Sequence, residues 1–100
     1  MENQILRKIF LAFIQIHILH HAVEEPIYGS WMMEELSHHG YTVSAGTLYP
    51  ILHSMEENGL LTVTSRNVGG KIRKYYRATE AGETVLREAK AKIRELTGEL

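Results

Sequence analysis

Residues 44–77 read SAGTLYPILHSMEENGLLTVTSRNVGGKIRKYYR, and the spacing of their hydrophobic side chains changes part-way along. As far as Gly59 the apolar residues recur every three or four positions, as they do on one face of a helix. From Leu60 they alternate with polar residues, stop at the turn-forming stretch Asn67-Val68-Gly69-Gly70, and alternate again from Lys71 to Arg77. The pattern predicts a helix followed by a basic β-hairpin.

The start of this predicted helix has two possible caps, and each assigns a different place to Pro50. If Ser44 is the N-cap, Pro50 lies beyond the first turn and should kink the helix. If Thr47 is the N-cap, Pro50 falls within the first turn, where proline is tolerated. The sequence leaves both alternatives open.

Helical patterns flank this segment on both sides. Residues 3–21 are apolar nearly all round, with a break at Pro26, and residues 28–39 form a second helix that ends at Gly40. After the hairpin, Thr79 caps a last helix with a single apolar stripe. This order is that of a winged helix-turn-helix, in which the third helix enters the major groove and the hairpin is the wing. We therefore predict a mostly α (α+β) fold, with an N-terminal helix and one C-terminal dimerisation helix.

The length and composition fit one soluble domain of 100 residues, 44% hydrophobic and 23% charged. We assign residues 1–78 to a DNA-binding domain, which includes the N-terminal helix 3–21 and the wing 60–78. Residues 79–100 form the dimerisation helix within the same compact unit. Because a chain of this size buries only roughly 60–65% of the surface of its unfolded chain and both terminal helices are strongly apolar, we expect a homodimer.

Several classes of protein are disfavoured by what the sequence lacks. There is no cysteine, which excludes disulfides and thiol chemistry and favours the cytoplasm. The uncharged apolar stretch 9–22 is too short to span a membrane, and no signal-peptide cleavage site follows it. The glutamate pairs are adjacent in sequence and therefore diverge, and no phosphate loop or nucleophile motif is present. We expect no enzyme, no cofactor and no membrane partner.

The charge is distributed unevenly along the chain. The formal net charge is −1, but residues 1–65 hold two basic against seven acidic residues, while residues 66–100 hold nine basic against five acidic. Residues 66–77 contain no acid, and their five cations are Arg66, Lys71, Arg73, Lys74 and Arg77. A local basic strip on a hairpin is what contact with DNA phosphates requires.

A set of residues in register from Tyr28 to Gly82 closely resembles a known family. The set comprises Tyr28-Gly29, Leu36, Gly40-Tyr41, Ser44-x-Gly46-Thr47-Leu48-Tyr49-Pro50-x-Leu52, Glu56-Glu57-x-Gly59-Leu60-Leu61, Gly70, Arg73-Lys74-Tyr75-Tyr76 and Thr79-x-x-Gly82. Together these residues resemble the PadR family of bacterial transcriptional regulators, in its short branch with one C-terminal helix. The departures are small: Met55 replaces a usual leucine, and Val68-Gly69 belongs to a variable wing tip.

The resemblance implies a repressor that dimerises through its first and last helices and binds inverted-repeat DNA, with possible release by a small hydrophobic or phenolic effector. Two alternatives stay open: a winged-helix module that binds protein, and a metal-responsive regulator. Because the third helix lacks Arg, Asn and Gln near its start, we expect readout to depend partly on DNA shape.

Candidate DNA contacts lie in two places. On the recognition helix they are Ser44, Gly46, Thr47 and Tyr49, which could otherwise serve capping and packing. On the wing they are Arg66, Lys71, Arg73 and Lys74, although Arg73 or Lys74 could instead brace the wing against the body.

Candidate dimer contacts are Ile5, Ile9 and Phe13 in the first helix, with Leu86, Ile93 and Leu96 in the last. An effector pocket could be lined by Phe13, Trp31 and Met32, residues that equally suit the core.

The first helix also carries three histidines, His17, His20 and His21. The i, i+4 spacing of His17 and His21 can hold Zn²⁺, but the chain has no cysteine or aspartate, and further ligands would have to come from a glutamate or a dimer mate. We therefore assign no metal ligand and expect surface or interface histidines that titrate near neutral pH.

Overall fold

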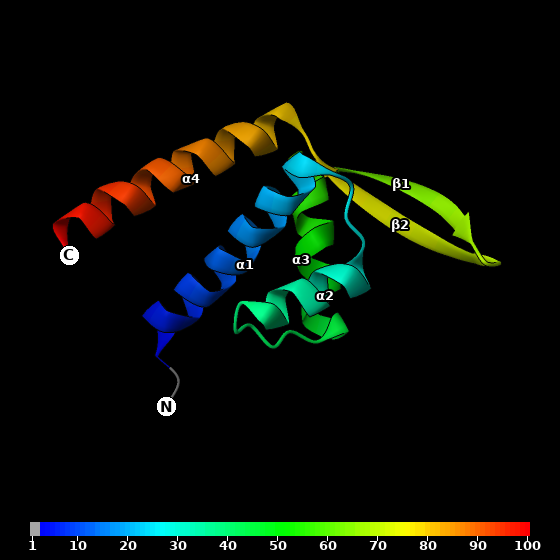
Figure 1. Cartoon of the computed structure of the whole chain (residues 1–100), viewed down its shortest axis with the longest axis horizontal. Coiled ribbons are helices and arrows are strands. Elements are labelled where there is room, and N and C mark those ends of the chain that lie inside the picture. The colour runs from blue at the N-terminus through cyan, green and yellow to red at the C-terminus, as the bar shows by residue number, and fades with distance from the viewer. Residues whose placement is uncertain (1–2) are drawn as a thin grey trace.

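The computed structural model describes residues 3–100, so the first two residues of the predicted domain 1–78 lie outside it. The described chain contains four helices and one antiparallel hairpin (Figure 1). The elements are α1 (Gln4–Glu24), α2 (Gly29–His38), α3 (Ala45–Glu57), β1 (Leu61–Val68), β2 (Lys71–Ala78) and α4 (Glu80–Glu99). The predicted winged helix-turn-helix fold is confirmed.

Helix α1 is longer than the predicted 3–21. The Asn3 side chain caps it by accepting from the backbone N–H groups of Ile5 (2.9 Å) and Leu6 (3.3 Å). The helix ends at Glu24 because Pro26 forces the preceding residue, Glu25, into extended backbone with φ −162° and ψ 163°.

The N-cap of α3 is Ser44, which places Pro50 inside the helix. Proline has no N–H, so the Gly46 carbonyl lacks the hydrogen bond that residue 50 would otherwise donate. The Ser44 hydroxyl donates to the Thr47 hydroxyl oxygen (3.3 Å) and does not accept from the helix backbone. The two candidate caps therefore contact each other.

The wing closes through a two-residue turn at Gly69 (φ +59°) and Gly70 (φ +84°). Two consecutive positive φ angles match the right-handed twist of the strands, which is why glycine occupies both positions. Asn67 and Val68, expected in the turn, are strand residues, and the Asn67 side chain accepts from the Gly70 N–H (3.0 Å).

Ile27, between α1 and α2, pairs with the other edge of β2, a contact that the sequence pattern does not indicate. Its N–H donates to the Tyr76 carbonyl (2.9 Å), and the Tyr76 N–H donates to the Ile27 carbonyl (2.7 Å). The base of the wing is therefore attached to the helical body by backbone hydrogen bonds.

The core lies where α1, α2 and α3 meet the base of the wing. Its buried residues are Ile14, Ile18, Leu19, Ala22, Ile27, Met32, Leu36, Leu48, Leu52, Met55, Leu61, Tyr76 and Leu86. Helix α4 joins this core through Gly82, which lies against the Leu60 carbonyl oxygen and Leu19. The predicted cap is confirmed: the Thr79 hydroxyl accepts from the Gly82 N–H (3.0 Å) and donates to the Gly59 carbonyl (2.6 Å).

Beyond this junction α1 and α4 diverge toward the two chain ends (Figure 1). Their outer faces keep large apolar side chains exposed, among them Ile5 (70%) and Leu96 (52%). By length and composition alone, the whole of α1, which extends beyond the uncharged stretch 9–22, is long and apolar enough to cross a membrane, with a mean hydropathy of 1.2. Four of its residues are nevertheless buried in the core described above.

Candidate nucleic-acid interface

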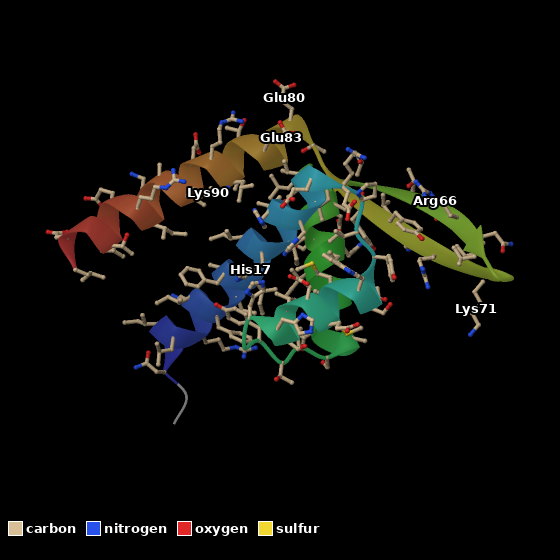
Figure 2. The ribbon with its side chains drawn as sticks, in the orientation of Figure 1. His17, Arg66, Lys71, Glu80, Glu83 and Lys90 are labelled. Carbon is tan, nitrogen blue, oxygen red and sulfur yellow. The ribbon has the colours of Figure 1, made fainter. Side chains whose placement is uncertain are left out.

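A groove of about 710 Å³ lies between the wing and the helical body. It is lined by Tyr28, Gly29, Ser30, Tyr49, His53, Val68, Lys71, Ile72, Arg73, Lys74 and Tyr76. Three of these residues are cationic and none is acidic. Lys71 projects from the tip of the wing (Figure 2). A concave surface of this charge suits a polyanion.

Two of the wing cations stack on tyrosine rings. Arg66 and Arg73 are direct cross-strand partners, which places their like charges on one face of the hairpin. The Arg73 guanidinium lies 4.0 Å from the ring centroid of Tyr28, and that of Arg66 lies 4.6 Å from the centroid of Tyr75. The two rings meet edge to face at 5.5 Å. Cation–π contacts therefore offset the repulsion between the two arginines and brace the wing against the start of α2.

Both helices that border the groove begin without a side-chain cap on the backbone. The N-caps, Tyr28 for α2 and Ser44 for α3, accept no hydrogen bond from the first-turn N–H groups, and neither first turn contains an acid. Free N–H groups at the positive end of a helix dipole favour an anion. Both helix starts are thus suited to contact with phosphate.

Tyr49 has a packing role as well as an exposed surface. A Cβ at Gly29 would collide with the Tyr49 ring and its hydroxyl, so the first turn of α2 lies directly against this ring. Tyr49 is still 43% exposed and lines the groove. Glycine at position 29 is what allows α2 and α3 to approach this closely.

The predicted DNA contacts are divided between two surfaces. Tyr49, Lys71, Arg73 and Lys74 line the groove. Ser44 and Gly46 are exposed at the start of α3 and Thr47 is half-buried there, whereas Arg66 lies on the wing and outside the groove lining.

Among the groove-lining residues that were not predicted as DNA contacts, three have polar side chains that are not buried: Tyr28, Ser30 and His53. The Tyr28-Gly29 pair, directly before a helix start without acid, is the signal that could have pointed to the first two.

The predicted dimer contacts are mostly accessible. Ile5, Ile9 and Phe13 are 70%, 43% and 38% exposed on α1, and on α4 Leu96 is exposed and Ile93 half-buried. Leu86 differs, because it is 5% exposed within the chain's own core and cannot offer its side chain to a partner.

The residues proposed for an effector pocket do not line either cavity described for residues 3–100. Met32 is fully buried in the core. Trp31 packs edge-on against His21, with ring centroids 5.3 Å apart. Phe13 alone remains on an open face.

Two of the α1 histidines, His17 and His21, face α2. The ring of His17 stacks on that of His39 with centroids 4.5 Å apart, and His21 Nε2 lies 3.6 Å from a Glu35 carboxylate oxygen. Burial, followed by the neighbouring histidines, lowers the pKa of His17 and His21. Both imidazoles are therefore neutral at pH 7.

A three-helix body with a basic two-stranded hairpin beside the exposed start of its third helix defines a winged helix-turn-helix protein. Residues 18–88 match the transcriptional regulator PadR-like family, and the chain belongs to this family. PadR-like proteins are DNA-binding regulators, generally dimeric, and are not enzymes.

Individual relatives agree with this assignment. The transcriptional regulator Rv3488 of Mycobacterium tuberculosis is 46% identical over 95 residues, which cover 95% of this chain and 89% of that protein. A PadR-like transcription factor from Bacteroides fragilis superposes with a TM-score of 0.84 at 28% identity, covering 97% of this chain and 95% of that one. A PadR family transcriptional regulator from Eggerthella lenta superposes with a TM-score of 0.82 at 35% identity, covering 95% of this chain and 84% of that one.

Proposed function

We propose that this chain is a cytoplasmic transcriptional repressor that binds an inverted-repeat operator as a homodimer. The observation that carries the proposal is the groove between the wing and the starts of α2 and α3, which is lined by three cations and no acid. Phosphate contacts of this kind supply most of the affinity of DNA-binding proteins.

In the proposed complex α3 lies in the major groove and the wing follows the adjacent backbone. Lys71 and Lys74 contact phosphates, and Arg73 combines such a contact with its stacking on Tyr28. Ser44, Gly46 and Thr47 present hydroxyls and backbone N–H groups at the start of α3. Since these groups discriminate bases weakly, DNA shape contributes to specificity.

The dimer buries the outer faces of α1 and α4. Their exposed apolar side chains, Ile5, Ile9, Phe13 and Leu96, form a surface that a second copy would cover. Two-fold symmetry then places two α3 helices about 34–36 Å apart, in successive major grooves. A small hydrophobic or phenolic effector bound near Phe13 on this face would alter that spacing and release the DNA.

The salt dependence of binding to the DNA upstream of the protein's own gene tests the proposal. Affinity should fall steeply as salt rises, with a slope of log K against log salt of about −0.9 per phosphate contacted. The double variant Lys71→Ala/Lys74→Ala removes up to two phosphate contacts per chain and four per dimer. It should therefore make the slope less negative by up to about 3.6.

The matched control is Lys92→Ala, an exposed cation on α4 that should leave the slope unchanged. An affinity that does not respond to salt, or a wing variant that behaves like the control, would refute phosphate contact. A dimer that binds no DNA but captures a protein would favour the interaction module.

A further inference from the structure

Two helical pairs of metal-binding side chains face each other across the α1–α2 contact. His17 and His21 are four residues apart on α1, while Glu35 on α2 and His39 at its C-cap are also four apart. One ring nitrogen from each of the three histidines lies within 4.8 Å of the others. A Glu35 carboxylate oxygen lies 3.4 Å from His39 Nε2 and 3.6 Å from His21 Nε2.

The two distances from Glu35 are close to the separation between neighbouring ligands of a tetrahedral zinc site. With metal–ligand bonds of about 2.0–2.1 Å, neighbouring donors in a tetrahedron lie roughly 3.3–3.4 Å apart. The two distances from Glu35 exceed this edge by only a few tenths of an ångström. The three histidine nitrogens, which lie within 4.8 Å of one another, would draw together around a bound ion.

The hydrogen bonding of the cluster also suits a ligand role. His21 Nε2 is buried and has no hydrogen-bond partner among the described residues. A buried polar atom without a partner costs free energy, and a metal ion would satisfy this one.

We propose that His17, His21, Glu35 and His39 form a binding site for one divalent transition-metal ion per chain, with Zn²⁺ the best match. Three imidazoles and one carboxylate favour zinc and its first-row neighbours over Mg²⁺ and Ca²⁺, which prefer oxygen ligands. One positive charge lies nearby and opposes the binding of a cation: Lys90 of α4 lines the same cavity as the four proposed ligands (Figure 2).

A second group, His20, His21 and Glu24, shares one histidine with the site. It lies on a single helix, and His20 and Glu24 are 46% and 63% exposed. Four donors from two helices hold an ion more firmly than three donors from one helix, two of which are exposed, so His21 is assigned to the inter-helix site.

A metal here would tie α1, whose outer face is the proposed dimer surface, to α2, which borders the proposed DNA groove. This step rests on the proposed function: by fixing the angle between α1 and α2, a bound metal ion would change the affinity of the dimer for DNA. Metal binding itself requires neither dimerisation nor DNA.

Titration calorimetry of the chelator-treated full chain with Zn²⁺, without DNA, tests the site. We expect one ion per chain, and a tetrahedral absorption spectrum when Co²⁺ replaces Zn²⁺. His39→Gln and Glu35→Gln should each weaken Zn²⁺ binding more than about tenfold, since even the loss of a supporting residue around a metal costs 10–100-fold.

His53→Gln is the matched control, because His53 forms an exposed i, i+4 pair with Glu57 (2.8 Å) and should leave binding unchanged. The Co²⁺ spectrum of the unmodified chain needs no variant to fold. Absence of binding, or binding that His20→Gln abolishes and His39→Gln does not, would overturn the proposal. Comparing DNA affinity with and without Zn²⁺ is a separate measurement, so a chain that binds zinc but no DNA would refute only the proposed function.

Discussion

Substituting Gly82 by alanine should destabilise the protein although alanine is the better helix former. A Cβ at this position would overlap the Leu60 carbonyl oxygen and lie 3.2 Å from Leu19 Cδ2. Because the main obstacle is backbone, it cannot rotate away, and the overpacking cost is at the upper end of about 1–3 kcal/mol. The gain in helix propensity is about 1 kcal/mol at most. The expected net loss is about 1–2 kcal/mol.

Gly98, on the same helix, is the matched control. Nothing among the described residues lies within 4 Å of a Cβ there, so Gly98→Ala should be neutral or stabilise slightly. Urea denaturation at one fixed protein concentration measures both variants, since the proposed dimerisation would make stability depend on concentration. The Gly82→Ala loss corresponds to a fall in Tm of about 4–8 °C per kcal/mol. Equal stability of the two variants would refute the close packing of α4 on the core.

Three further predictions follow from the same contacts. Burial lowers the pKa of His17 and His21, so the unfolded chain binds protons more readily than the folded one. With chelator present, the free energy of unfolding should therefore have its full value above pH 6.5 and decrease as the pH falls below 6.5. Denaturation at several pH values measures this dependence. Tyr28→Ala removes the ring under Arg73 and should weaken DNA binding by about two- to fivefold, the worth of an exposed cation–π contact, in fluorescence anisotropy. Ile5→Glu puts a charge on the outer face of α1 and should give monomers in sedimentation velocity.

The first two predictions have a contrary outcome, and the third has a matched control. Replacing the half-buried His17 and His21 with glutamine should flatten the pH profile of stability, and an unchanged profile would contradict their titration. A Tyr28→Ala chain with wild-type DNA affinity contradicts bracing of the wing. Gln15→Glu adds the same charge at an exposed polar site on α1, and it should leave the dimer intact.

The elements of the fold were predictable because their signals are local. Alternation on both sides of Gly69-Gly70 indicates the hairpin, and Thr79 marks the start of the last helix. The N-cap of α3 was not predictable, because Ser44 and Thr47 are both good caps and only tertiary packing chooses between them. The pairing of Ile27 with Tyr76 involves one residue, which is too short for a periodic pattern.

The parts of the sites that sequence could not supply depend on contacts between distant residues. Arg73 and Lys74 were equal candidates for bracing the wing until the Tyr28 ring was placed beneath Arg73. The partners of His17 and His21 lie on the next helix, and no spacing rule connects them. Leu86 and Leu96 share the apolar stripe of α4. Because only the N-terminal end of α4, at Gly82, packs closely on the core, Leu86 is buried and Leu96 is exposed.

We propose that two copies of this chain read an inverted repeat in DNA. Binding-site selection from random duplexes with the purified protein tests this proposal. We expect enrichment of an inverted repeat whose half-site centres lie one helical turn, about 10–10.5 base pairs, apart, with enrichment reduced by Lys71→Ala/Lys74→Ala. Recovery of no enriched sequence, or of single unpaired half-sites, would contradict it.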